Sequence, residues 1–320
     1  MNGRGQYNRY QSDRKTADRR IKESEKKMSD VIVLEDVTKR YGNEEVVKNA
    51  SMHVKEGEIY GFLGPNGAGK TTVIKMLTNL WKPTSGSIEI FGEILTPQSC
   101  EILKRIGSII EFPTFYNHMT GYENLQLHCE YMGYYKHGSI ENALDLLELS
   151  AASQKAVKNY SLGMKERLGI ARAILCKPEL LILDEPTAVL TPQEVDKLFD
   201  VLRNMRDDGR AIIIITHKLN EVLELSDRVS ILRKGKYIGT LQTSEATVES
   251  LTEMMVGEKI SLDINRPMPH DLKKRLTIDT ITCTNEDGLH TLENVSFEAF
   301  GGEVLGVAGI SGSGQKELLE

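Results

Sequence analysis

The sequence lacks any long apolar run. Its longest candidate, residues 211–216, is far shorter than the roughly 18 apolar residues that a membrane-spanning helix needs. The four cysteines are scattered, with no spacing typical of a metal site: Cys100, Cys129, Cys176 and Cys283. The N-terminus is polar, which predicts no secretory signal. These absences argue against a membrane-spanning protein or a secreted disulfide scaffold, and they favour a reduced cytosolic compartment.

Charge is unevenly distributed along the 320 residues, whose formal net charge is −6. Residues 1–29 hold nine Lys and Arg against four Asp and Glu, a net +5, which leaves −11 for the remainder. A basic segment can contact anionic lipid or nucleic acid, but so polar a stretch is more typical of a disordered tail. We therefore expect residues 1–29 to be a disordered basic leader, and we expect no nucleic-acid partner.

The remainder alternates short apolar strands with amphipathic helices. Apolar content of 40% and charged content of 27% are those of a globular protein, and the length suffices for about two domains. Strands are expected at 31–37, 46–54, 59–63, 87–91, 180–183 and 211–215, and helices at 72–80, 140–149, 161–175, 192–206 and 219–225. Residues from about 98 to 160 are expected to be helix-rich. The alternation predicts an α/β fold whose parallel sheet has helical crossovers, preceded by an antiparallel pair of strands.

A glycine-rich loop joins the expected strand 59–63 to the helix that follows it. The loop reads Gly-Pro-Asn-Gly-Ala-Gly-Lys-Thr-Thr and matches G-x-x-x-x-G-K-[ST] in the strand-loop-helix context that a phosphate site requires. Its amides and the helix N-terminus favour anionic oxygens. Lys70 is expected to reach the β- and γ-phosphates, and the Thr71 hydroxyl to ligate Mg²⁺. The predicted nucleotide-binding residues here are Gly64, Asn66, Gly67, Gly69, Lys70, Thr71 and Thr72.

Two further features carry the chemistry of a nucleotide site. Asp184 and Glu185 end an apolar strand, so that Asp184 can hold Mg²⁺ opposite Thr71 while Glu185 polarises an attacking water. Ser161 and Gly163 begin a helix, where a hydroxyl, an N–H and the helix dipole favour an anion. Taken alone, the acids could be a solvated strand end and the serine an ordinary helix cap, but the glycine-rich loop upstream favours the functional interpretation.

The order of these motifs resembles that of an ABC transporter ATPase, a P-loop NTPase core with an antiparallel β-subdomain and a helical subdomain. The resemblance makes residues 30–256 one nucleotide-binding domain that uses ATP and Mg²⁺. It implies that Tyr41 stacks on adenine, that His217 contacts the γ-phosphate, and that Ser161 and Gly163 face the nucleotide of a partner domain. Glu111 stands where the family usually has the Q-loop glutamine, and it is expected to reach Mg²⁺.

An internal repeat links the two ends of the chain. Residues 56–70 recur as residues 301–315, with Gln315 at the position of Lys70. We expect a linker at 257–275 and, at 276–320, the N-terminal fragment of a second, degenerate and truncated ABC cassette.

The resemblance changes along the chain. Residues 31–187 resemble bacitracin-resistance and lantibiotic-immunity ATPases, whereas residues 188–320 resemble nucleoside and simple-sugar importer ATPases, so the sequence reads as a mosaic of natural or artificial origin. The resemblance implies ATP hydrolysis that energises a separate transmembrane permease, with a second nucleotide-binding domain in a homodimer or a tandem. It places the protein peripherally on the cytoplasmic face of the plasma membrane. Peptide or antibiotic export is preferred, and nucleoside or sugar import is the alternative.

Two other classes of function remain open on the sequence. A ribosome- or DNA-associated ABC protein would need two cassettes around a long basic or coiled-coil insert, whereas the expected linker is short. A non-catalytic cassette would not need the set Lys70, Asp184, Glu185 and His217.

Overall fold

The computed structural model describes residues 29–258, 273–284, 290–309 and 314–319. The expected leader, except Ser29, and most of the expected linker therefore lie outside the described residues. The chain divides into two compact units, Met1–Ile260 (the first unit) and Ser261–Glu320 (the second unit). None of the described helices is long and apolar enough to cross a bilayer.

A ten-stranded sheet organises the first unit, in the order β5-β4-β1-β2-β10-β9-β3-β8-β7-β6. The run from β9 to β6 is parallel, and β1, β2, β4 and β5 pair antiparallel. The two halves meet at one parallel pair, Lys236 with Lys48. The strands are β1 (Asp30–Tyr41), β2 (Glu44–Lys55), β3 (Ile59–Leu63), β4 (Ser85–Ile90), β5 (Glu93–Ile94), β6 (Ile106–Ile109), β7 (Leu180–Asp184), β8 (Ala211–Ile215), β9 (Arg228–Arg233) and β10 (Lys236–Gln242).

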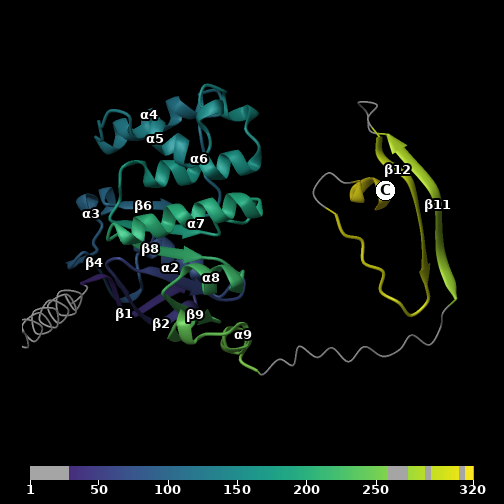
Figure 1. Cartoon of the computed structure of the whole chain (residues 1–320). Coiled ribbons are helices and arrows are strands. Elements are labelled where there is room, and N and C mark those ends of the chain that lie inside the picture. The colour runs from purple at the N-terminus through teal and green to yellow at the C-terminus, as the bar shows by residue number, and fades with distance from the viewer. Residues whose placement is uncertain (1–28, 259–272, 285–289, 310–313, 320) are drawn as a thin grey trace, which may run out of the picture. The chain divides into compact units, whose positions relative to one another are not determined.

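Helices cover the sheet and build a separate layer above it. In Figure 1, α4, α5 and α6 form this helical layer at the top of the first unit. Thr120 caps α4 and Thr191 caps α7, each with a reciprocal Glu three residues on, which explains where these helices begin. The α-helices of the first unit are α2 (Lys70–Leu77), α3 (Cys100–Lys104), α4 (Gly121–Met132), α5 (Ser139–Leu146), α6 (Leu162–Leu175), α7 (Pro192–Asp207), α8 (Leu219–Leu225) and α9 (Val248–Val256).

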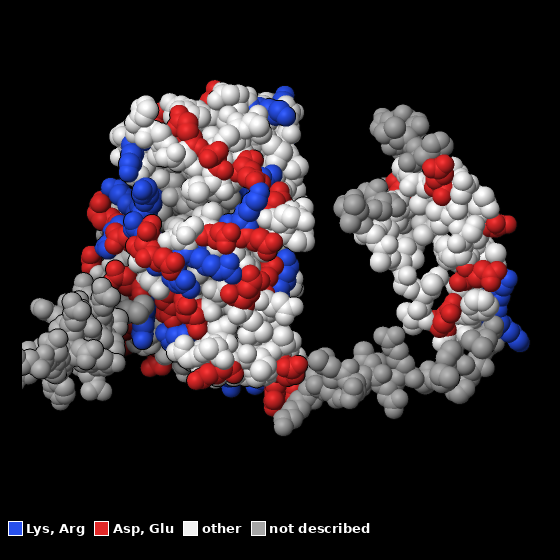
Figure 2. Space-filling view, viewed as in Figure 1, with Lys and Arg blue, Asp and Glu red and all other residues white. Residues whose placement is uncertain are grey.

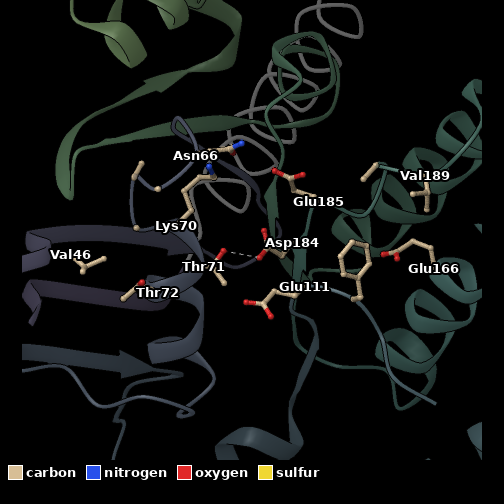
Figure 3. Close-up of a pocket in the computed structure, with 15 residues that line it drawn as sticks. Val46, Asn66, Lys70, Thr71, Thr72, Glu111, Glu166, Asp184, Glu185 and Val189 are labelled. Atoms are coloured by element: carbon tan, nitrogen blue, oxygen red, sulfur yellow. Dashed lines mark hydrogen bonds between the residues drawn. The ribbon is translucent and has the colours of Figure 1, made fainter. Parts of the chain in front are cut away.

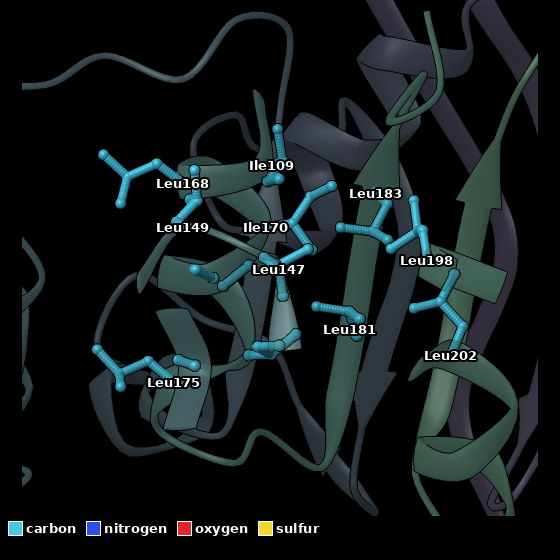
Figure 4. Packing of buried hydrophobic residues seen from close by; sticks show 14 of the residues in the cluster. Ile109, Leu147, Leu149, Leu168, Ile170, Leu175, Leu181, Leu183, Leu198 and Leu202 are labelled. Carbon is cyan, nitrogen blue, oxygen red and sulfur yellow. The ribbon is translucent and has the colours of Figure 1, made fainter. Parts of the chain in front are cut away.

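The central strands are buried on both faces because each face packs against a different core. In β8, Ile212 and Ile214 join the cluster under the helical layer, whereas Ile213 and Ile215 join the cluster around α2 and β1. This is the alternation of side chains that a strand imposes. Figure 4 shows the first cluster, in which residues of β7 pack against α6 and α7: Leu181, Leu183, Leu168, Ile170, Leu198 and Leu202. The double burial fixes the ends of β3 and β7, from which the site residues project.

The structure confirms the predicted α/β alternation and corrects some of its details. The helix expected at 72–80 begins at Lys70 and ends at Leu77. The helix-rich region at 98–160 also contains a strand, β6, which pairs with β7 and ends just before Glu111. This strand was not predicted. It spans only four residues, too few for a periodic pattern to distinguish it from its helical neighbours.

Acidic and basic side chains are interspersed on the face of the first unit that Figure 2 presents. Over α7, Arg203 pairs with Asp200 and with Glu224, and Arg206 pairs with Asp227. Exposed pairs of this kind contribute little stability, about 0–1 kcal/mol each. Their effect here is to balance the charge of this surface.

The second unit contains an antiparallel hairpin, β11 (Lys274–Thr284) with β12 (His290–Phe300), and a short helix, α10 (Gln315–Leu319). The hairpin repeats the irregularities of β1 and β2. Asp36 and Asn49 have φ of 48° and 47°, and Thr280 and Asn294 have φ of 53° and 51°. Left-handed residues inside strands mark bulges, so the two hairpins share their bulge positions.

Hydrogen bonds repeat between the hairpins as well. The Asn49 N–H donates to Thr38 Oγ1 at 3.0 Å, and the Asn294 N–H donates to Thr282 Oγ1 at 3.1 Å. The segment that follows differs, because residues 303–309 repeat the sequence around β3 but form no strand. The second unit thus resembles the first unit in its hairpin, and the truncated second cassette stays a prediction.

Candidate nucleotide-binding site

The glycine-rich loop lies between β3, buried along its whole length, and the start of α2. A Cβ on Gly64 would stand 2.2 Å from the carbonyl oxygen of Leu232, so only glycine fits there. Gly69 has φ of 104°, a conformation that turns the chain into the helix. The loop is therefore shaped by backbone contacts that its glycines allow.

Lys70 is folded back over this loop and is almost fully buried. Its Nζ donates to the carbonyl oxygens of Gly64 at 2.6 Å and Pro65 at 3.2 Å. Burial lowers the pKa of Lys70, and the nearby carboxylates Glu185 and Asp184 oppose that shift. The two carbonyl oxygens are neutral acceptors and compensate the buried ammonium only weakly. An anionic phosphate in their place would form stronger charge-assisted hydrogen bonds with Lys70.

Thr71 and Asp184 come together from opposite sides of the site, as Figure 3 shows. The Thr71 Oγ1 donates to Asp184 Oδ2 at 3.1 Å. Burial raises the pKa of Asp184, while the hydrogen bond from Thr71 lowers it. A hydroxyl and a carboxylate at this separation are the oxygen ligands that Mg²⁺ takes, so these residues fit the metal that accompanies a nucleotide.

Glu185 directly follows the end of β7 in a left-handed conformation, with φ of 51°. Its N–H donates to the Ile215 carbonyl at 2.8 Å, which ties this turn to β8. Its Oε1 lies 3.2 Å from Nδ1 of His217. The turn therefore places the carboxylate of Glu185 beside His217.

Glu111 lies just beyond β6, also with a left-handed φ, of 58°. Its Oε1 pairs with the Lys75 ammonium at 2.7 Å. That ammonium also lies 4.7 Å from the centre of the Trp81 ring, and Trp81 meets Tyr41 edge to face with ring centres 5.5 Å apart. Tyr41 is thus connected to the Glu111 side of the site through two intermediate side chains, and it is exposed enough to stack on a base.

A cavity of about 420 Å³ brings most of the predicted residues together. Its lining includes Asn66, Gly67, Gly69, Lys70, Thr71, Thr72, Glu111, Asp184 and Glu185. Gly64, the first residue of the loop, does not line the cavity but accepts from Lys70, and His217 adjoins the cavity through Glu185. Tyr41, Ser161 and Gly163 do not line it.

Ser161 caps α6, and its Oγ accepts from the Met164 N–H at 3.2 Å. Ser161 and Gly163 are solvent-accessible at the start of this helix rather than turned into the cavity of their own domain. Their positive helix end is therefore available to an anion outside this domain.

Comparisons with known proteins agree with this geometry. The ABC transporter family profile matches residues 47–188. YcbN of Bacillus subtilis (strain 168), an uncharacterized ABC transporter ATP-binding protein, is 51% identical over 214 residues, 66% of this chain and 69% of that protein. BcrA of Bacillus licheniformis, a bacitracin transport ATP-binding protein, is 47% identical over 212 residues, with the same shares of 66% and 69%. The chain is an ABC transporter ATP-binding protein.

Other relatives match a longer part of the chain at lower identity. NupA of Lactococcus lactis subsp. cremoris, a nucleoside import ATP-binding protein, is 32% identical over 299 residues, 91% of this chain but 59% of that protein. An ATP-binding subunit of an ABC transporter has a solved structure with a TM-score of 0.65 and 26% identity, covering 71% of this chain and 98% of that one. The structure of the dimeric bacterial ABC transporter cassette MJ0796 has a TM-score of 0.60 and 27% identity. The match covers 66% of this chain and 98% of that one.

Membership of this family settles the activity. ABC ATPases bind ATP with Mg²⁺ and hydrolyse it to power transport, and this chain is such an ATPase. Thr71 and Asp184 offer the oxygens that would hold magnesium, which when bound would neutralise charge on the phosphates.

Several side chains around the cavity were not predicted from the sequence. Phe112, Val189 and Glu166 line it, and Lys75 pairs with Glu111 beside it. One signal was available for Lys75, which follows Thr71 by four residues and therefore lies on the same face of α2.

Glu166 is a buried carboxyl group on α6 whose stability effect depends on pH. Only 4% of its surface is exposed, and burial raises the pKa of Glu166 from 4.5 to about 7. Because the folded pKa is the higher one, the folded protein binds the proton more tightly, and its stability falls as pH rises from 4.5 to 7. At pH values above 7, this effect lowers the free energy of unfolding by as much as about 3 kcal/mol. We expect Glu166→Gln, which has no proton to lose, to remove that destabilisation.

Urea unfolding of both proteins at pH 5 and pH 8 checks this. The variant is expected to gain stability relative to wild type at pH 8, while Glu101→Gln, on the exposed face of α3, is the control. Equal pH dependence of wild type and Glu166→Gln would contradict the assignment.

Proposed function

We propose that this ATPase energises a separate membrane permease that exports a peptide or antibiotic. The observation that carries the proposal is the 47% identity with a bacitracin transport ATP-binding protein over 212 residues. The protein then acts at the cytoplasmic face of the plasma membrane, held there by the permease. None of the helices that the structure describes could itself span the membrane.

Each residue of the site has a role in this proposal. Lys70 and the loop amides bind the β- and γ-phosphates, and Thr71 and Asp184 hold the magnesium. Glu185 accepts a proton from the attacking water, and His217, whose Nδ1 lies 3.2 Å from Glu185, contacts the γ-phosphate and orients that carboxylate. Tyr41 stacks on adenine with Trp81 supporting it from the edge.

Two nucleotide-binding domains are needed to complete each site. Ser161 and Gly163 are accessible but do not line the cavity of their own domain, which suits contact with the nucleotide of a facing domain. The similarity to the dimeric cassette MJ0796 supports this arrangement. The partner is a second copy of this chain or a tandem domain.

Nucleoside or sugar import is the second candidate, and a specific observation favours it. NupA matches 91% of this chain, which must include part of the second unit, because the first unit holds only residues 1–260 of the 320. The shared bulges and hydrogen bonds of the two hairpins support the proposal that residues 276–320 start a second cassette. A tandem layout of this kind would supply the facing domain within one polypeptide.

Phe112 offers a surface through which the permease can be tested. Its side chain is 70% exposed and adjoins Glu111 at the rim of the cavity. Aromatic side chains, Phe among them, are enriched at protein interfaces. We therefore propose that the permease docks at Phe112. Because Phe112 lines the cavity, contact there could change how the nucleotide is bound.

Capture of the full chain by detergent-solubilised permeases tests both points. A permease of a bacitracin transporter is expected to bind, a nucleoside permease is not, and Phe112→Ser is expected to weaken capture by about tenfold. Ile94→Ser, at a similarly exposed residue of β5, is the matched control. Capture by the nucleoside permease alone would replace export with import.

A further inference from the structure

Lys75 connects three parts of the site that lie far apart in the sequence. Its Nζ pairs with Glu111 at 2.7 Å and lies 4.7 Å from the centre of the Trp81 ring. Its carbonyl oxygen accepts from the Trp81 N–H at 2.9 Å. Trp81 in turn meets the Tyr41 ring at an interplanar angle of 75°. One lysine therefore holds both the acidic residue after β6 and the ring that supports Tyr41.

Glu111 stands between that lysine and the magnesium residues. It lines the same cavity as Thr71 and Asp184, and Figure 3 shows it beside that hydrogen-bonded pair. Its negative charge adds to that of Glu185 in raising the pKa of Asp184, after the larger effect of burial. Glu111 and Asp184 therefore face the same cavity, into which a metal ion held by Thr71 and Asp184 would fit.

We propose that Lys75 is a positioning residue that competes with magnesium for the carboxylate of Glu111. Without nucleotide, the ion pair holds Glu111 at α2. When Mg·ATP is present, Glu111 exchanges Lys75 for the metal, and the released ammonium changes its contact with Trp81. The inference rests on the proposed nucleotide site and adds a regulated step to it.

The chemistry of the residues makes such an exchange feasible. Glu111 is 60% exposed on its side chain and Lys75 is 20% exposed, so the pair is screened by water. A pair of this kind changes an equilibrium constant by about fivefold at most, which a divalent cation can overcome. A neutral glutamine at the position of Glu111 would form no ion pair with Lys75, so the device depends on the acid present here.

Trp81 makes the exchange visible, because it is the only tryptophan in the sequence. ATP is added to the full chain in EDTA, and Mg²⁺ is then titrated in, with tryptophan fluorescence recorded at each stage. ATP alone is expected to alter the signal through Tyr41. The added magnesium is expected to alter it again in wild type and Lys75→Arg, but not in Lys75→Met or Glu111→Gln.

Calorimetric titration of Mg²⁺ into the ATP-loaded protein gives the second readout. Lys75→Met is expected to tighten Mg²⁺ binding about two- to fivefold, since it removes the competitor. In the Glu111→Gln background the same change is expected to have no effect. Lys104→Met is the matched control, since Lys104 forms a pair of equal length, 2.7 Å, with Glu101 on α3.

Three outcomes would overturn the inference. Equal effects of Lys75→Met in both backgrounds would show a general effect of charge rather than competition for Glu111. An unchanged signal on adding Mg²⁺ to the ATP-loaded wild type would show that Lys75 stays in place. The absence of any response to ATP, in fluorescence and in calorimetry, would contradict the nucleotide site itself.

Discussion

Glu185→Gln is expected to lower ATP turnover by at least about a hundredfold while leaving ATP binding intact. The amide keeps the size of the side chain and can still contact His217, whose Nδ1 lies 3.2 Å from Glu185 Oε1. It cannot accept the proton that the attacking water must lose. Phosphate release measured on the full chain gives the turnover, and calorimetry gives the affinity for ATP.

A matched control separates this effect from a general loss of charge. Glu101→Gln removes an exposed carboxylate from α3 and is expected to leave turnover unchanged. If Glu185→Gln and wild type hydrolysed ATP at the same rate, another group would have to be the base. A loss of ATP binding in Glu185→Gln would also contradict the role, because it would place the residue in binding rather than catalysis.

Lys70→Ala is expected to weaken ATP binding by at least about tenfold, which is the loss of one charge-assisted hydrogen bond to the phosphates. In the structure the Lys70 ammonium donates to the Gly64 and Pro65 carbonyls. These bonds exchange for phosphate oxygens, so the variant loses a bond that is made only with nucleotide. Calorimetry with ATP in excess Mg²⁺ measures the loss.

Folding has to be checked separately for this variant because Lys70 is buried. Circular dichroism and urea unfolding establish that the variant keeps its fold, and Lys104→Ala serves as an exposed lysine control. Wild-type affinity in a folded Lys70→Ala protein would contradict the phosphate assignment.

The strongest motifs predicted their surroundings well because several local signals agreed. The stretch 59–77 has an apolar strand, a loop with obligatory glycines and a helix, and the structure places β3 and α2 there. Asp184 and Thr71, 113 residues apart, lie within hydrogen-bond distance at 3.1 Å, and their role as metal ligands stays a prediction. Local propensity, burial and chemistry all favoured one arrangement in these segments.

Other features depended on contacts that no local pattern contains. The strand β6 is defined by its pairing with β7, and its four residues carry no periodicity of their own. Glu166 was not predicted because a charged residue on a helix is ordinarily exposed, and only the packing around α6 buries it. The contact between Lys75 and Glu111 depends on the left-handed conformation of Glu111 after β6. The sequence does not predict that conformation.

The central claim is that the loop 64–72 binds the terminal phosphates of ATP and that Thr71 and Asp184 ligate the accompanying metal ion. An experimental structure of the full-length Glu185→Gln protein with Mg·ATP tests it most directly. We expect the Lys70 ammonium to have left the Gly64 carbonyl for a phosphate oxygen, and the metal to lie against Thr71 and Asp184. A triphosphate bound elsewhere, or Lys70 still bonded to Gly64 with nucleotide present, would contradict the account.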